Sequence, residues 1–84
     1  MNMVEAFADL IHLARERNYD TIGFEQHGVD FEHLESMLNR IQANPTGFSS
    51  AKLGRWLGYA QGVMVATGTF TLDEMKDLNR LHAD

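Results

Sequence analysis

The sequence AKLGRWLGYAQGVMVAT, residues 51–67, decides the fold because it predicts the most apolar helix of the chain. Its small residues recur at every fourth position and therefore lie along one side of a helix: Gly54, Gly58, Gly62 and Ala66, called here the glycine stripe. The opposite side carries larger apolar residues at helical spacing: Leu53, Trp56, Leu57, Ala60, Val63 and Met64. We expect this third helix to be almost wholly buried and to lie in the middle of the fold.

The glycine stripe predicts a close approach of another backbone. Each glycine inside a helix costs about 0.8–1.0 kcal/mol relative to alanine, so a contact must offset the cost of three. The contact lies either within the chain or against another chain. Because a small domain needs its most apolar helix for its own core, we predict a contact within the chain. Tyr59 and Gln61 flank the stripe, and Gln61 needs hydrogen-bond partners from a packed helix or in a contact surface.

Capping patterns divide the rest of the chain into three more helices. Each of the four predicted helices follows a side chain that can accept a first-turn N–H: Asn2, Asp30, Ser49 and Thr71. The first helix covers about residues 3–17, the second ends at Asn44-Pro45, and the third stops at Gly68. Glu74 completes a capping box with Thr71. Residues 18–29 lack clean periodicity and predict an ordered loop whose apolar side chains, Tyr19, Ile22 and Phe24, cover the core.

These segments predict an all-α protein, a small four-helix bundle with a central glycine-striped third helix. The connections are short, and neither a strand pattern nor an internal repeat is present, so residues 1–84 form a single helical domain. A chain of 84 residues is near the size at which apolar burial only just exceeds the entropy cost of folding. A partner protein or self-association into a homo-oligomer would therefore stabilise it.

Composition excludes several classes of protein. Without cysteine the chain has no disulfide, thiolate metal site or thiol nucleophile, which favours a reducing cytoplasm. The formal net charge of −5 disfavours direct binding to nucleic acid, because phosphate binding needs a basic surface. The uncharged stretch Trp56–Leu72 falls short of the roughly 20 apolar residues of a membrane span.

Acidic residues gather in one segment: Asp20, Glu25, Asp30, Glu32 and Glu35. Such a surface either attracts a basic partner protein or only keeps the chain soluble. For binding a partner protein, the candidate residues are those of the acidic segment and those around the stripe: Glu32, Glu35, Gly58, Tyr59, Gln61 and Gly62.

Lys52 and Arg55 lie in the first turns of the third helix, where a cation opposes the helix dipole by typically 0.3–1 kcal/mol. One explanation is an anion site, in which these cations, Ser49, Ser50 and free N–H groups bind a phosphate or carboxylate. The other explanation pairs the two cations with acidic residues of the second helix.

No catalytic or metal-binding pattern is present. The four histidines, at positions 12, 27, 33 and 82, match no helical ligand pair. Ser49 and Ser50 have no nearby histidine in sequence and no glycine-rich turn around them. We therefore expect a protein that is not an enzyme and that holds no metal and no cofactor.

Residues 52–63, KLGRWLGYAQGV, followed by Gly68, TLDE at 71–74 and Asn79, resemble a segment of small proteins encoded by bacteriophages and prophages. The likeness covers roughly the second half of the chain. That family has no established common activity, so the resemblance implies a setting, the bacterial cytoplasm during infection. Small acidic phage proteins often act by occupying a host protein, including defence nucleases such as CRISPR effectors.

Two functional hypotheses follow. The first is a phage-type accessory protein that binds a bacterial host protein stoichiometrically, for instance as an anti-CRISPR-like inhibitor. The alternative is a small-ligand module that binds a nucleotide or another phosphorylated molecule at the start of the third helix, through Ser49, Ser50, Lys52 and Arg55.

Overall fold

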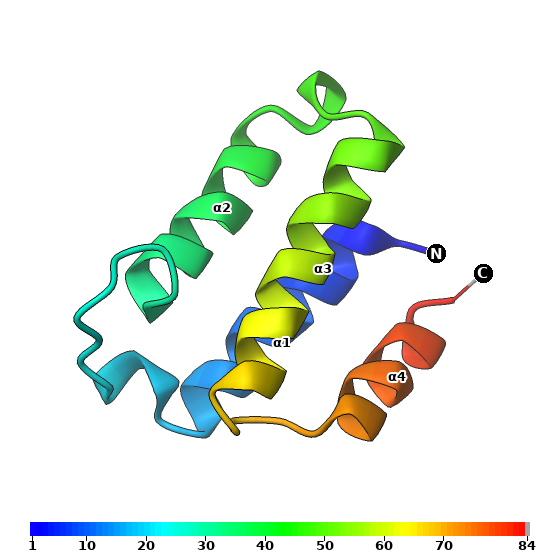
Figure 1. Cartoon of the computed structure of the whole chain (residues 1–84). Coiled ribbons are helices and arrows are strands. Elements are labelled where there is room, and N and C mark those ends of the chain that lie inside the picture. Colours follow the sequence, from blue (N-terminus) through cyan, green and yellow to red (C-terminus); the bar gives the residue numbers. More distant parts are fainter. Residues whose placement is uncertain (84) are drawn as a thin grey trace.

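The computed structural model describes residues 1–83 and confirms the all-α four-helix bundle (Figure 1). The helices are α1 (Met3–Glu16), α2 (Phe31–Ala43), α3 (Ser50–Ala66) and α4 (Leu72–Leu81). Two single-turn 3-10 helices, η1 (Tyr19–Thr21) and η2 (Pro45–Gly47), lie in the connections. Residues 1–83 contain no strand.

The predicted caps form the helix boundaries. Asn2, Asp30 and Ser49 each accept the N–H of the residue three positions later. Thr71 and Glu74 form both hydrogen bonds of a capping box. Gly68 follows α3 with a φ of +73°, a left-handed conformation that glycine adopts without steric cost. Local side-chain chemistry therefore sets where these helices start and where α3 stops.

The central helix is α1, and the prediction that the third helix occupies the middle is wrong. Helix α1 contacts each of the other three helices, and α2 and α4 lie on either side of it in Figure 1. Its buried residues are Ala6, Phe7, Leu10, Ile11 and Ala14. Helix α3 buries only Leu57, Ala60, Val63 and Met64, so it is not almost wholly buried as predicted. Glycine contributes to an apolar pattern but has no side chain to bury, so α1 offers more apolar surface to the core.

The glycine stripe faces solvent, so the predicted close contact within the chain is also wrong. A Cβ atom added to Gly58 or Gly62 would meet no atom within 4 Å. At Gly54 the nearest atom would be the Sδ of Met3, at an ordinary contact distance of 3.7 Å. The stripe therefore runs along the outer side of α3, which no other helix of the bundle covers at Gly58 and Gly62.

The loop at residues 18–29 packs on the core through fewer side chains than predicted. Tyr19 is fully buried, donates a hydrogen bond to the carbonyl of Val29 and packs against Phe24, with ring centroids 5.4 Å apart. Burial raises the pKa of the Tyr19 phenol. Ile22, predicted to cover the core, is 45% exposed. The Tyr59 hydroxyl donates to the carbonyl of Gly28 (2.5 Å) and thereby connects the loop to α3.

Polar contacts attach α4 to the rest of the bundle. The guanidinium of Arg17, the residue that follows α1, pairs with Glu74, donates to the carbonyl of Thr69 (2.7 Å) and stacks over Phe70. The hydrogen bond from Arg17 is the main cause that lowers the pKa of Glu74 from 4.5 to about 2. At the other end of α4, the His82 ring lies 3.0 Å from a carboxylate oxygen of Asp9.

Candidate functional site: the groove between α3 and α4

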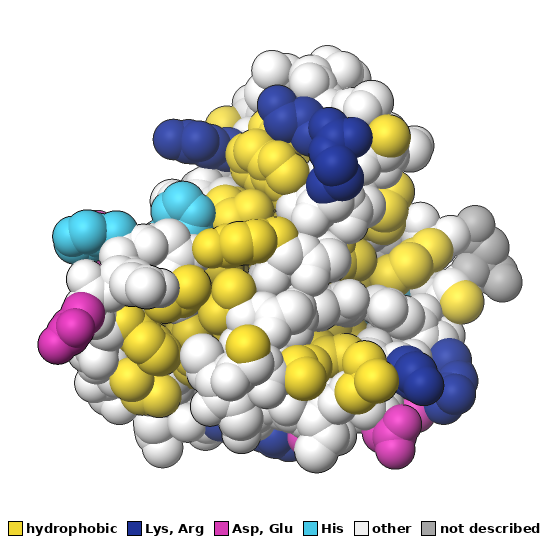
Figure 2. Space-filling view, viewed as in Figure 1, with side chains coloured by type: hydrophobic (Ala, Val, Ile, Leu, Met, Phe, Trp, Pro, Cys, Tyr) yellow, Lys and Arg dark blue, Asp and Glu magenta, His cyan; other side chains and the backbone are white. Residues whose placement is uncertain are grey.

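A groove of about 420 Å³ runs between α3 and α4, and the glycine stripe forms part of its wall. The residues that line this α3–α4 groove are Gly58, Gln61, Gly62, Val65, Ala66, Leu72, Met75, Lys76 and Asn79. In Figure 2 white atoms, which are backbone and uncharged polar side chains, lie among apolar patches in the middle of this face. The groove is thus a mainly apolar hollow with exposed helix backbone along one side.

Helix α4 supplies the opposite wall of the groove. Its capping box fixes the start of the helix, and therefore the position of Leu72 in its first turn. Leu72 lies in the first turn after Thr71 and is 59% exposed, while Met75, one turn later, is buried. The sequence pattern predicts Leu72 and Leu81 on the core face of α4, but both are exposed, Leu81 by 72%. Helix α4 therefore buries only Met75 and Leu78 of its predicted apolar face.

Gln61 and Asn79 join the two walls. The Gln61 amide donates to Oδ1 of Asn79 (2.7 Å), and the Asn79 amide lies 3.5 Å from Oε1 of Gln61. The predicted need of Gln61 for a partner is therefore met by a side chain of the neighbouring helix. Each amide carries two N–H groups and uses one of them in this pair, so each keeps a second N–H.

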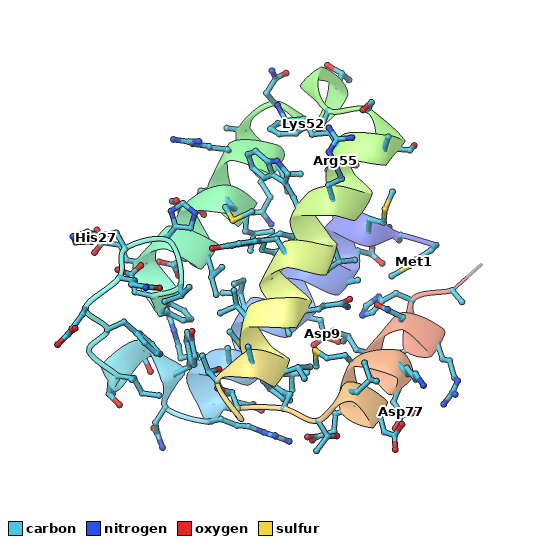
Figure 3. The ribbon with its side chains drawn as sticks, viewed as in Figure 1. Met1, Asp9, His27, Lys52, Arg55 and Asp77 are labelled. Atoms are coloured by element: carbon cyan, nitrogen blue, oxygen red, sulfur yellow. The ribbon has the colours of Figure 1, made fainter. Side chains whose placement is uncertain are left out.

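Three cations without an ion pair in the described chain lie on α3 or line the groove. Three of the seven Lys and Arg residues form ion pairs: Arg15 with Glu35, Arg17 with Glu74 and Arg80 with Asp77. The other four, Arg40, Lys52, Arg55 and Lys76, form no ion pair within residues 1–83. Lys52 and Arg55 lie on α3, and Lys76 lines the groove. Figure 3 shows Lys52 and Arg55 at one end of α3, far along the molecule from Asp77.

The candidate anion site lies at that end of α3, but two of its four residues have structural roles. The Ser49 hydroxyl accepts the N–H of Lys52 (3.1 Å) as the helix cap. The Lys52 ammonium lies 4.9 Å from the ring centroid of Phe48 and 5.3 Å from that of Trp56, within the range of cation–π attraction. The predicted ion pairs of Lys52 and Arg55 with acids of the second helix do not form. Ser50 and Arg55 are exposed.

The candidate residues for partner binding divide into two groups. Gly58, Gln61 and Gly62 meet in the groove. Tyr59 contacts the loop at Gly28, and the two acidic candidates, Glu32 and Glu35, lie on α2. Glu35 pairs with Arg15 (2.8 Å), whereas Glu32 is exposed beside His33 and Ser36 in a separate hollow.

Sequence reasoning missed the α4 residues of the groove. Leu72, Lys76 and Asn79 occupy positions separated by four and three residues, a spacing that places them on one side of a helix. That spacing is the signal that predicts a shared surface. What it does not predict is that α3 faces them.

The histidines form isolated pairs. His12 lies 3.1 Å from Glu16, and His82 lies 3.0 Å from Asp9. Within residues 1–83, no group of three or more His, Cys, Asp and Glu residues is placed to hold a metal ion. In the same part of the chain, the length and apolar character needed to cross a membrane are found in none of the helices.

Comparison with protein-family models, curated proteins and solved structures finds no match to this chain. The groove and the charges around it are therefore the observations that bear on function.

Proposed function

We propose that this is a non-enzymatic interaction protein of the phage accessory type, which binds a bacterial host protein stoichiometrically through the α3–α4 groove. The observation that carries the proposal is the exposed helix backbone at Gly58 and Gly62 beside an open apolar groove. Recognition of a helix by an apolar groove is a common mode of protein binding, and the two glycines in the α3 wall let the bound backbone come close.

The cost of the stripe supports this use. Gly58 and Gly62 together cost the helix about 1.6–2.0 kcal/mol relative to alanine, and no contact within the chain offsets that cost. Leu72 adds a large apolar side chain that is 59% exposed at the edge of the groove. A partner seated in the groove would bury this apolar surface and use the close approach that glycine allows.

The resemblance to phage-encoded proteins supports a bacterial host protein as the partner. The similar segment includes groove residues from both helices, Gly58, Gln61, Gly62 and Asn79. A protein of this size inhibits by covering a functional surface of its target, and a defence nuclease in the cytoplasm of the infected cell is one such target.

Affinity capture from bacterial cells tests the proposal. The Gly58→Leu and Gly62→Leu variants fill the groove face with side chains that meet open space, so both variants stay folded. We expect the wild-type chain to retain a partner that both variants lose, and calorimetry with that partner to saturate at a fixed molar ratio. The matched control is Gly23→Leu, which adds the same side chain in open space away from the groove. Equal capture by all variants, or turnover of a substrate without saturation, would contradict the proposal.

A further inference from the structure

We infer that the partner presents an acidic amphipathic helix to the α3–α4 groove. The inference rests on the proposed function and names the chemistry of the partner. It follows from the absence of acidic residues from α3 and from the described groove lining, in a chain whose net charge is negative.

The described residues that line the groove include one cation and no acid, although the chain as a whole is acidic. The sequence has twelve Asp and Glu residues against seven Lys and Arg, yet residues 50–66 of α3 contain no acid. Among the groove-lining residues, all within 1–83, Lys76 is the only charged one. Arg55 and Lys76 have no ion-pair partner in the described chain, whereas Arg15, Arg17 and Arg80 each have one. Lys76 thus lies in the groove without an ion-pair partner among residues 1–83, and Arg55 lies on the helix that carries the glycine stripe, outside the groove lining.

The positions of these cations match the flanks of a bound helix. Arg55 precedes Gly58 by three residues and Gly62 by seven, so it lies on the stripe side of α3, near its N-terminal end. Lys76 lies on the opposite wall, between Leu72 and Asn79. From Arg55 to Ala66, α3 rises about 16 Å, the length of three helical turns. A partner helix of about three turns would place small residues against the stripe and carboxylates beside Arg55 and Lys76.

A second copy of this chain fits the face less well. The outer side of its α3 would bring Arg55 and no carboxylate, because α3 contains no acid. Two chains with a formal net charge of −5 also repel each other. An acidic helix from another protein supplies the carboxylates that the α3 of a second copy lacks, and opposite charge across an interface favours encounter and fixes orientation.

The free N–H groups of Gln61 and Asn79 add a polar contact at the middle of the groove. Their mutual hydrogen bond holds both amides at the boundary between the walls. A carboxylate or an exposed carbonyl of the bound helix accepts the remaining N–H groups. Acceptors on the partner therefore meet donors at two places in the groove, the amide pair and Lys76, and at Arg55 on the stripe side of α3.

A pair of synthetic peptides tests the inference on the full chain. Both are 15-residue helices with alanine on the stripe side and leucine toward the groove, and their flanks carry either glutamate or lysine. We expect the glutamate peptide to shift the backbone amide NMR signals of Gly58, Gly62 and Lys76. We expect it to bind about tenfold more tightly than the lysine peptide, as two exposed ion pairs allow. Raising the salt concentration should reduce this preference.

Charge reversal supplies the controls. The double variant Arg55→Glu with Lys76→Glu should reverse the preference toward the lysine peptide. Arg40→Glu makes one such charge reversal on α2, outside the groove, and should leave the preference intact. Equal or tighter binding of the lysine peptide would overturn the inference, and so would the absence of amide shifts with either peptide. A dimer detected by light scattering, with the groove at its interface, would also overturn it.

The two proposals fail in different ways. Suppose that a host partner is lost by Gly58→Leu but retained by the Arg55→Glu, Lys76→Glu variant. This result would contradict the inference of an acidic partner helix and would leave the proposed function intact. If Gly58→Leu retains every partner that the wild-type chain binds, the proposed function itself is contradicted.

Discussion

The α1–α2 pair and the α3–α4 pair use their apolar residues differently. Helices α1 and α2 bury five residues each. Helix α3 is the longest, with 17 residues, but it buries four, and α4 buries two. The first pair therefore supplies most of the helical core, while the second covers it on one side and leaves an open groove. The difference teaches that the apolar content of a helix does not measure how much of it is buried.

The two pairs also differ in how they are held. The apolar face of α1 packs directly on α2, whereas α4 buries only Met75 and Leu78 and is also held at its ends, through Arg17 with Glu74 and Asp9 with His82. Between these ends, the Gln61–Asn79 pair links α4 to α3. Specific polar contacts thus add to the apolar packing of Met75 and Leu78 in positioning α4.

The largest expected effect is the loss of an α1 core side chain. Phe7 is 1% exposed, and Phe7→Ala should lower the free energy of unfolding by about 3–5 kcal/mol, because the cavity adds to the lost burial. Urea denaturation followed by circular dichroism measures the change. The matched control on α4 is Leu81→Ala, where 72% exposure limits the effect to about 0.5 kcal/mol. Similar decreases in the free energy of unfolding for the two variants would contradict the difference in burial between the two halves.

Alanine in the glycine stripe should stabilise the second half. The added methyl groups of Gly58→Ala and Gly62→Ala enter open space, so each variant should raise the free energy of unfolding by about 0.8–1.0 kcal/mol. Thermal melting of the single and double variants measures this. Gly68→Ala should have the opposite sign, because its φ of +73° strains any other residue. A stripe that packs against another part of the chain would instead make Gly58→Ala destabilising.

Tyr59→Phe should have a smaller effect, since it removes only the hydrogen bond to the Gly28 carbonyl. We expect a loss of about 0.5–1 kcal/mol, the usual net value of one such bond. Hydrogen exchange should rise in residues 22–29 and stay unchanged in α1. Faster exchange throughout α1 would mean that the loop contributes to the core more than its exposure indicates.

The pH dependence of α4 docking should be the weakest effect, because the Arg17–Glu74 pair is exposed and screened by solvent. The folded-state pKa of Glu74 lies near 2, below its ordinary 4.5. The pair therefore stabilises the fold above pH 4.5, and this contribution is lost as the pH falls from 4.5 toward 2. Glu74→Gln should lower the melting temperature at pH 7 and reduce its loss over that range. An unchanged acid profile would show that Glu74 does not hold α4.

The helix boundaries could be predicted from sequence because caps are local. Asn2, Asp30, Ser49 and the Thr71–Glu74 pair each act over three residues, within one turn of backbone. The bounds differ from the predicted ones by a residue, as α1 ends at Glu16 and not at 17. Three candidate residues of the groove, Gly58, Gln61 and Gly62, could be selected for a similar reason, since their spacing and polarity within one helix are visible in the sequence.

The amino-acid sequence by itself determined the all-α class, the caps and the presence of a glycine stripe on one side of α3. Only the tertiary structure decided that α1 is central, that the stripe faces solvent and that Leu72, Lys76 and Asn79 form the opposite wall. The physical reason is that hydrogen bonds within one turn depend on neighbours in sequence. Burial depends on how much side-chain surface each helix offers to the others. Glycine counts as apolar in a sequence pattern, but it has no side chain and so offers no such surface.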